Sequence, residues 1–321
     1  MQAILAVTVP FFALVLCGYL AARLNRLPDS AVPGLNGFVL FFALPCMLFR
    51  FGAGTPLLTL LNPTVLVVYG LAALLIVAAT VALTRGPRLG LPDAALGALV
   101  AAFPNSGFMG VPLLAALLGP QAVGPVMCTL LTDLFLTSSV CIALAQAHGL
   151  AGAAPGVVVR SALRGPLTNP LPWAIALGAL FSVLGLQLPG PVASVVRMLA
   201  DAATPVALFT IGAVLCRAQR HATRHTPAAE VWPVAGIKLV VHPLIVYAGG
   251  RAAQALGAPL PPAALTALTL AAALPSASNV SLLAERYGAD NGRIARIILA
   301  STVLAFGTFS ALAWLMGVQP S

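Results

Sequence analysis

The sequence predicts an all-α integral membrane protein with about ten transmembrane helices, arranged as two inverted repeats of five. Three observations lead to this fold class. The 321 residues are 60% hydrophobic and only 7% charged, whereas soluble domains carry about 25% charged residues. The charges cluster between long uncharged runs, which are too continuous for the alternating strands of a membrane barrel. Two distinctive features of the first half of the chain also return in the second half.

The apolar runs define the predicted helices, because a helix needs about 20 apolar residues to cross the hydrocarbon core of a bilayer. The first run lacks a basic segment before it and is too long for a cleavable signal, so we expect it to remain as the first helix. The predicted spans are 2–22, 31–50, 64–84, 93–118, 120–146, 169–187, 191–216, 231–255, 261–284 and 292–317. Residues 1–146 then form the first repeat, 147–168 a short cytoplasmic linker and 169–317 the second repeat.

The net charge of +9 follows the predicted topology and does not indicate nucleic-acid binding. Twelve of the 16 basic residues fall on one side of the predicted spans: Arg23, Arg26, Arg85, Arg88, Arg160, Arg164, Arg217, Arg220, Arg224, Arg286, Arg293 and Arg296. Only Arg50 and Arg251 fall on the other side. Because positively charged loops stay in the cytoplasm, we expect a multi-pass protein of the inner (cytoplasmic) membrane with both termini on the non-cytoplasmic side.

An internal repeat supports two related halves. The pattern P-x-x-L-F-x-x-G-A occurs at Pro45–Ala53 and again at Pro205–Ala213, 160 residues later. With five spans in each half, the second half must cross the membrane in the opposite direction to the first. Inverted repeats of this kind are typical of secondary transporters, whose substrate sites lie near the bilayer midplane.

Two predicted spans contain a proline near the middle followed by small polar residues. The prolines are Pro104 and Pro275, 171 residues apart. Proline removes an amide donor and clashes with the preceding turn, so both helices are expected to break, and a broken backbone at membrane depth normally lines a polar cavity. A simple proline kink is the alternative. The predicted substrate-binding residues are Asn105, Ser106, Gly107, Ser276, Ser278 and Asn279.

Ionisable residues within spans are costly and often functional. Asp133 lies in the fifth predicted span, and Lys238 and His242 lie on one face of the eighth. These three residues are candidates for an ion- or proton-coupling site, and a buried Asp–Lys pair that only holds helices together is the alternative. Arg197 and Asp201, four residues apart, are expected to form an interfacial pair.

The run Pro104–Pro112, with the sequence PNSGFMGVP, resembles the signature of the auxin efflux carrier family, which includes plant PIN proteins and bacterial malonate- and malate-type carriers. The Phe42–Pro45 segment and the Pro205 segment also resemble this family. The resemblance covers the whole chain and implies a fold like those of sodium/proton antiporters and bile-acid transporters, with helices 4 and 9 crossing at their breaks. It also implies a scaffold of helices 1, 2, 6 and 7, which can form a homodimer contact, and a mobile transport part made of the other helices. Asn105 then corresponds to the substrate-contacting asparagine of the crossover.

The resemblance and the residues together predict a secondary transporter that moves a small organic anion by alternating access. A malonate- or malate-like carboxylate or an auxin-like anion fits the predicted site, and a non-transporting sensor or an anion channel is the alternative. The absence of a Ser–His or paired-Asp arrangement and of an H-E-x-x-H motif argues against a membrane enzyme, and the short connections leave no room for a soluble signalling domain. No cofactor or metal is expected, and the sequence leaves coupling to protons or sodium ions open.

Overall fold

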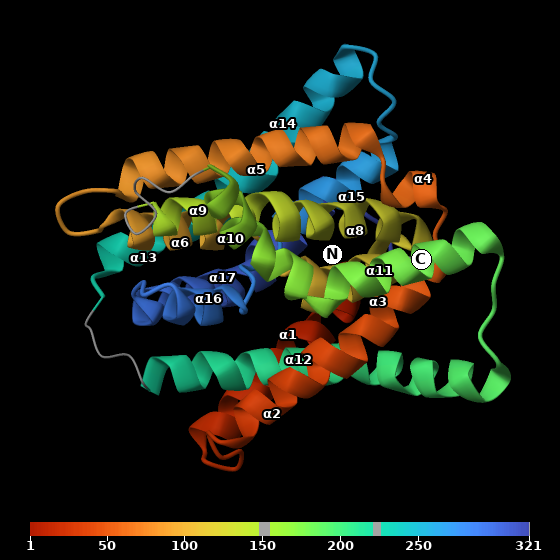
Figure 1. Cartoon of the computed structure of the whole chain (residues 1–321), viewed down its shortest axis with the longest axis horizontal. Coiled ribbons are helices and arrows are strands. Elements are labelled where there is room, and N and C mark those ends of the chain that lie inside the picture. Colours follow the sequence, from red (N-terminus) through yellow and green to blue (C-terminus); the bar gives the residue numbers. More distant parts are fainter. Residues whose placement is uncertain (148–154, 221–225, 321) are drawn as a thin grey trace.

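The computed structural model describes residues 1–147, 155–220 and 226–320. Seven helical segments in these ranges are long and apolar enough to cross a bilayer: Gln2–Arg23, Ala31–Ala53, Leu57–Thr84, Pro120–Gln146, Gly190–Arg220, Ala228–Ala255 and Asn291–Leu315. Figure 1 shows them as a bundle. Helices α5 and α12 both lie horizontally in this view, and several other helices cross them obliquely. The prediction of an all-helical, multi-pass membrane protein is confirmed.

Several segments combine more than one helical element. Three of the long segments are single helices: α1 (Gln2–Arg23), α12 (Gly190–Arg220) and α17 (Asn291–Leu315). The segment Ala31–Ala53 consists of α2 (Ala31–Phe38), η1 (Val39–Ala43) and α3 (Leu44–Ala53), and Leu57–Thr84 consists of α4 (Leu57–Leu60) and α5 (Pro63–Thr84). The segment Pro120–Gln146 consists of η3 (Pro120–Ala122), α8 (Val123–Thr132), η4 (Asp133–Thr137) and α9 (Ser138–Gln146), and Ala228–Ala255 consists of α13 (Ala228–Gly236), η5 (Ile237–Val241) and α14 (His242–Ala255). The shorter elements are α6 (Leu91–Ala102), η2 (Ser106–Gly110) with α7 (Val111–Leu118), α10 (Pro155–Thr168), α11 (Pro170–Leu184), α15 (Pro262–Ala272) and α16 (Val280–Arg286).

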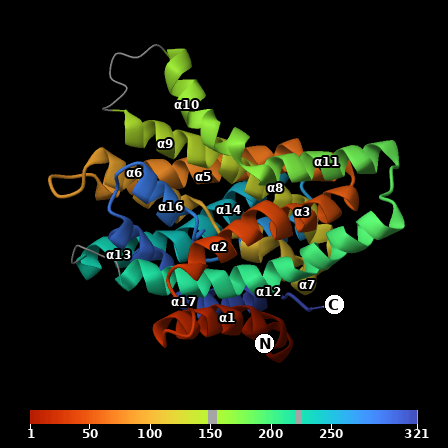
Figure 2. The same ribbon diagram turned by 60° about the horizontal axis from the view of Figure 1, so that its bottom comes forward.

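The predicted linker at 147–168 is not a plain loop. Its second part forms α10, a helix of 14 residues, which projects from the rest of the bundle in Figure 2. The linker has too few apolar residues to resemble a spanning run, and the sequence analysis therefore missed this helix. Residues 148–154 of the linker and Arg224 of the arginine-rich side lie outside the described residues.

Helices α1 and α12 pack with their backbones in direct contact. A Cβ atom added at Gly18 would lie 1.8 Å from the carbonyl oxygen of Phe209, and one added at Gly212 would lie 1.9 Å from that of Val15. Only glycine fits at either position. Small residues that let backbones approach are a common basis of helix association in membranes, and these two glycines therefore set the distance between α1 and α12.

A second pair of helices, α3 and α11, packs in the same way. A Cβ atom added at Gly178 would lie 2.4 Å from the carbonyl oxygen of Phe49, and one at Gly52 would lie 3.0 Å from that of Ile175. The two glycine-mediated contacts therefore join α1 to α12 and α3 to α11. Gly52 and Gly212 are the glycines of the repeated P-x-x-L-F-x-x-G-A pattern.

Helix α6 lies in the centre of the core. Every residue from Ala94 to Ala102 is buried, so the helix has neighbours on all sides. Its alanine-rich sequence explains this position, because a helix with small side chains all around can be enclosed by other helices at close distance. The helix interruption that follows α6 consequently lies in the interior of the molecule.

Candidate functional site

Both proline-containing spans are interrupted in the structure. Helix α6 ends at Ala102 and helical geometry resumes at Ser106, while α15 ends at Ala272 and α16 begins at Val280. Phe103 adopts an extended conformation with φ −101° and ψ 97°. Proline restricts the residue before it to extended conformations, which explains why α6 ends at Ala102 and Phe103 is no longer helical.

The two breaks are joined to each other by backbone hydrogen bonds. The Asn105 amide donates to the Pro275 carbonyl at 2.8 Å, and the Ala277 amide donates to the Phe103 carbonyl at 3.0 Å. Together they form an antiparallel bridge between Pro104 and Ser276. Buried backbone groups need partners, and each break supplies partners for the other. The segments that the sequence analysis singled out are thus neighbours in space.

The two asparagines of the crossover have unused hydrogen-bonding capacity. Asn105 is 3% exposed, and Asn279 is half-buried and precedes α16. The Oδ1 atoms of both side chains are buried without a hydrogen-bond partner among the described residues. Buried polar atoms are nearly always paired, and two unpaired amides at one place therefore indicate a site that a polar ligand or water completes.

The serines of the crossover are held by hydroxyl groups of neighbouring helices. The hydroxyl oxygens of Ser106 and of Thr129 on α8 lie 3.3 Å apart. Ser301 on α17 accepts from the Ser276 amide at 3.2 Å and donates to its hydroxyl at 3.1 Å. Thr129 and Ser301 were missed by the sequence analysis, and their only signal is that each is a polar residue in an apolar run.

The remaining two predicted site residues line the breaks without a hydrogen bond that identifies a role. Gly107 is buried within η2, and an added Cβ atom there would make only ordinary contact with Leu130, at 3.5 Å. Ser278 is 7% exposed and directly precedes Asn279. Gly110, at the end of η2, has a clearer reason to be glycine, because a Cβ atom there would lie 2.6 Å from the Leu274 side chain.

Asp133 is fully buried and hydrogen-bonded on both carboxylate oxygens. Tyr69 on α5 donates to one oxygen at 2.9 Å, and Thr137 donates to the other at 3.1 Å. Both Asp133 and Tyr69 are completely inaccessible. A buried carboxylate is tolerated only when hydrogen bonds compensate for lost solvation, and Tyr69 and Thr137 provide this compensation.

Lys238 connects the eighth predicted span to the break of the ninth. Its Nζ atom donates to the carbonyl oxygen of Ala272 at 2.6 Å and lies 3.3 Å from Nδ1 of His242. Ala272 is the last residue of α15, and a cation is favourable at a helix C-terminus because it offsets the helix dipole and binds a free carbonyl. Lys238 therefore stabilises the end of α15 at the break.

Asp133 and Lys238 do not form a direct ion pair. Among the described residues, no Asp133–Lys238 contact within 4.0 Å is present, and each residue has the separate partners given above. The rings of Tyr69 and His242 lie 5.7 Å apart and connect the two groups, while Nε2 of His242 is buried without a partner. The three predicted coupling residues therefore belong to one buried polar cluster, together with Tyr69.

Both charged residues of this cluster lie on π-helical turns. Asp133 is the first residue of η4, and Lys238 lies within η5. Such wide turns are uncommon in helices and occur often at functional sites. The sequence analysis did not foresee them, since a π-turn has no sequence signature as clear as the proline of the two breaks.

A further buried cation, Arg293, has a structural role that was not predicted from the sequence. Arg293 is 1% exposed and donates to the Asp93 carbonyl at 3.0 Å, and its Nε atom lies 3.9 Å from Glu230. Asp290 caps the same helix through the Arg293 amide. Asp93, Glu230 and Asp290 are three of the chain's seven acidic residues. This arginine was assigned only to the basic side in the sequence analysis, but it also holds α6, α13 and α17 together.

The expected pair between Arg197 and Asp201 is replaced by a different one. Asp201 on α12 accepts from Arg50 on α3 at 2.8 Å, with both side chains partly exposed. The i,i+4 spacing alone favoured Arg197, but α3 packs beside α12 and brings Arg50 within reach. The pair joins two separate segments and not two turns of one helix.

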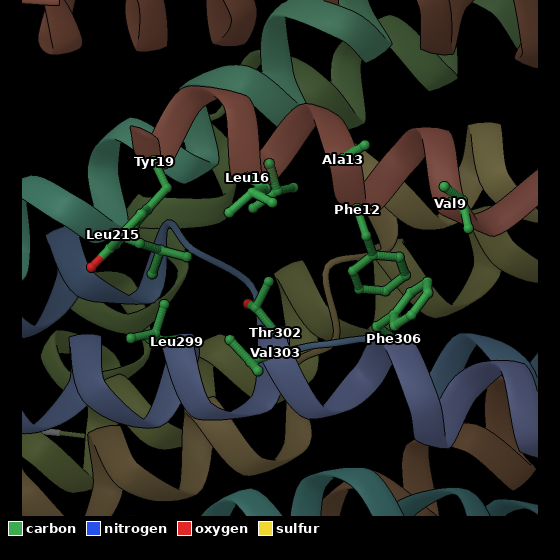
Figure 3. A pocket seen from close by; sticks show the side chains of 11 residues that line it. Val9, Phe12, Ala13, Leu16, Tyr19, Leu215, Leu299, Thr302, Val303 and Phe306 are labelled. Atoms are coloured by element: carbon green, nitrogen blue, oxygen red, sulfur yellow. The ribbon is translucent and has the colours of Figure 1, made fainter. Parts of the chain in front are cut away.

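The apolar groove between α1 and α17 is not suited to an anion. It has a volume of about 520 Å3 and its walls include Phe12, Leu16, Val303 and Phe306. Figure 3 shows the hydroxyl of Tyr19 at one end of the groove and carbon atoms along nearly all of the rest. The crossover, with its amides and hydroxyls, is therefore the better candidate for binding a small polar molecule.

Comparison with known proteins supports a transport role. Residues 3–314 match the family described as membrane transport protein. The chain is 30% identical to a Rhizobium meliloti (strain 1021) protein named "Putative malonate transporter", over 98% of this chain and 97% of that protein. It is 27% identical to an uncharacterized transporter of Methanothermobacter thermautotrophicus over 91% of each chain. The uncharacterized transporter YfdV of Escherichia coli (strain K12) is 24% identical over 92% of each. Because the family match covers nearly the whole chain, this protein belongs to the membrane transport protein family, the auxin efflux carrier family whose motif it carries at Pro104–Pro112.

Proposed function

We propose that this protein is a secondary transporter that moves a small organic anion by alternating access at the crossover. The observation that carries the proposal is the bridge between the two broken helices, beside which the side-chain amides of Asn105 and Asn279 make no hydrogen bond to the described residues. The helical stretch Ser106–Leu118 begins at the bridge. Its Ser106 amide donates to the Pro104 carbonyl at 2.8 Å, so the amides of Gly107 and Phe108 are those that are proposed to bind the anion at this helix N-terminus. With the amide groups of Asn105 and Asn279, they form a site built from neutral donors.

The proposal includes the ten-helix, five-plus-five inverted repeat. Gly18 and Gly178 are 160 residues apart, as are Gly52 and Gly212. In the first contact Gly18 meets the helix of Gly212, and in the second Gly178 meets the helix of Gly52. An exchange of the two halves therefore maps one contact onto the other. Thr129 contacts the crossover residue Ser106, and Ser301 contacts Ser276. Thr129 and Ser301 are 172 residues apart, so they also occupy corresponding positions in the two halves.

The proposal also assigns α1, α2–α3, α11 and α12 to a scaffold and the remaining spans to a transport part, as the resemblance to the family implies. The scaffold is the proposed contact surface of a homodimer. The proposed orientation places the arginine-rich connections in the cytoplasm and both termini on the opposite side of the inner membrane, in keeping with the positive-inside rule. Figure 1 is consistent with alternate connections at opposite ends, because the α5–α6 connection lies on the left and the α11–α12 connection on the right.

The proposed substrate is a dicarboxylate such as malonate or malate. The name of the Rhizobium meliloti relative and the small, polar character of the crossover support this choice. The cluster of Asp133, Lys238 and His242 is the proposed coupling site for protons or sodium ions. Lys238 already binds the last carbonyl of α15, so a change of charge in the cluster would act directly on one side of the crossover.

Replacement of either crossover asparagine by alanine is expected to reduce uptake of radiolabelled malonate or malate to background in proteoliposomes. Each variant loses a side-chain amide that makes no hydrogen bond to the described residues, and with it the Nδ2 group that would donate to a carboxylate, while the backbone bridge remains. Asn36→Ala on α2 is the matched control, because it makes the same change far from the crossover, and it should retain wild-type uptake. Wild-type uptake by both Asn105→Ala and Asn279→Ala, with normal folding, would exclude the crossover as the binding site.

A further inference from the structure

A second groove differs from the one in Figure 3 because it has a charged end. It lies between α14, α15 and α17 and has a volume of about 700 Å3. Much of its wall is aliphatic, with Val240 and Leu244 on one side and Leu312 and Leu315 on the other. Leu244 and Leu315 are largely exposed in the described chain, which in a membrane protein places them against lipid.

The long polar side chains of this groove lie on α14, while Thr266, Thr269 and Thr308 on the other walls donate their hydroxyls to carbonyls of their own helices. Tyr247, Arg251 and Gln254 all line it, and their spacing places them on one face of the helix. Gln254 donates to the Leu260 carbonyl at 2.8 Å, which fixes its side chain at the end of the groove. Arg251 is exposed and forms no ion pair with the described residues. The guanidinium of Arg251 therefore places a positive charge without an acidic partner among the described residues at the end of this groove.

The length of the groove matches one leaflet of a bilayer. The eleven helical steps from Val240 to Arg251 rise by about 16 Å at 1.5 Å per residue, and half of the hydrocarbon core measures about 15 Å. An acyl chain that lies along α14 would therefore reach Val240 when its headgroup is level with Arg251. Figure 1 shows the C-terminal end of α14 projecting upward from the rest of the bundle.

We propose that this groove is a binding site for one anionic phospholipid, with the acyl chain against Val240, Leu244 and Leu312 and the phosphate on Arg251. The aliphatic wall fits the chain, and the single cation favours a headgroup with net negative charge over a zwitterionic one. Arg251 stands at the end of the bundle that has few basic residues, so the attraction is local and does not come from a general basic surface.

The lipid would contact the segment that carries the buried cluster. Leu239 and Val240 of η5 follow Lys238 directly, and Pro243 of the groove follows His242. A chain in the groove would therefore pack on the outer face of the π-turn whose inner face carries Lys238. We expect the lipid to stabilise this turn and thereby the folded protein, since a ligand that binds only the folded state raises its stability.

The test is thermal unfolding of the purified full-length protein in neutral detergent with added dioleoyl-phosphatidylglycerol or dioleoyl-phosphatidylcholine. Wild-type protein should gain several degrees more from phosphatidylglycerol than from phosphatidylcholine. Arg251→Gln should lose this difference, while Arg85→Gln, which removes one arginine from the opposite end, should keep it. Native mass spectrometry should show one retained phosphatidylglycerol in the wild type and in Arg85→Gln, and none in Arg251→Gln.

A second variant makes the test independent of the charge change. Leu244→Trp places a large side chain in the groove at a lipid-facing position, and it should abolish phosphatidylglycerol retention with Arg251 intact. Equal stabilisation of the wild type by both lipids would overturn the proposal. Full phosphatidylglycerol-specific stabilisation in Arg251→Gln, or an equal loss of it in Arg85→Gln, would also overturn it.

Discussion

Gly212→Ala is expected to lower the melting temperature of the protein in detergent by several degrees and to reduce the yield of folded protein. An added Cβ atom at this position would lie 1.9 Å from the Val15 carbonyl oxygen and 2.5 Å from the Tyr19 amide nitrogen. Both contacts are with backbone, so no side-chain rotation can relieve them. Overpacking of a tight core typically costs about 1–3 kcal/mol, and here α1 would have to move away from α12.

The chain offers a matched control for this change. Gly307 lies in α17, and an added Cβ atom there would meet nothing within 4 Å. Gly307→Ala should leave the melting temperature unchanged or raise it slightly, because alanine is favoured over glycine within helices. Equal melting temperatures of Gly212→Ala and Gly307→Ala, measured by differential scanning fluorimetry, would show that α1 and α12 do not meet as described.

Lys238→Met is expected to abolish transport and to destabilise the protein by about 1–3 kcal/mol, the usual cost of leaving a buried hydrogen-bond acceptor without its donor. The change leaves the carbonyl oxygen of Ala272 without its donor. It also removes the positive charge nearest to the Asp133 cluster, although Asp133 keeps its hydrogen bonds from Tyr69 and Thr137. Unfolding in detergent and malonate uptake in proteoliposomes measure the two effects separately.

The double variant Asp133→Asn/Lys238→Met decides between a coupling site and a structural pair. Removal of both charges should recover part of the lost stability, since the buried cluster is then left without an uncompensated negative charge, although the Ala272 carbonyl remains without its donor. A coupling site requires that transport stays absent in the stable double variant. Recovery of transport together with stability would instead assign both residues to holding the helices in place.

The parts of the fold that depend on local chemistry could be predicted from the sequence. The spanning segments follow from the length of the apolar runs, and the interruptions at Pro104 and Pro275 follow from the missing amide of proline. Symmetry between the two halves made it possible to expect that these interruptions would be neighbours. The glycine pair Gly18 and Gly178, at the same 160-residue offset as the repeated pattern, was an additional signal that the sequence analysis did not use.

Other features depend on contacts between distant segments and were not predictable from local patterns. Asp201 has an arginine four residues before it, but the packing of α3 on α12 gives it Arg50 as its partner. The π-turns that present Asp133 and Lys238, and the helix α10 in the predicted linker, likewise have no periodic pattern in the sequence. In each case a tertiary contact overrides or adds to what the local sequence favours.

The bridge between Pro104 and Ser276 limits how the molecule can change shape. Pulling the two breaks apart would strand the Asn105 and Ala277 amides and their two carbonyl acceptors in an interior without water, and each stranded group costs several kcal/mol. Helices α6, α7, α15 and α16 are therefore tied into a single stiff block. Any rearrangement that opens the block first to one aqueous compartment and then to the other has to occur at its borders, where apolar surfaces can slide without breaking a hydrogen bond.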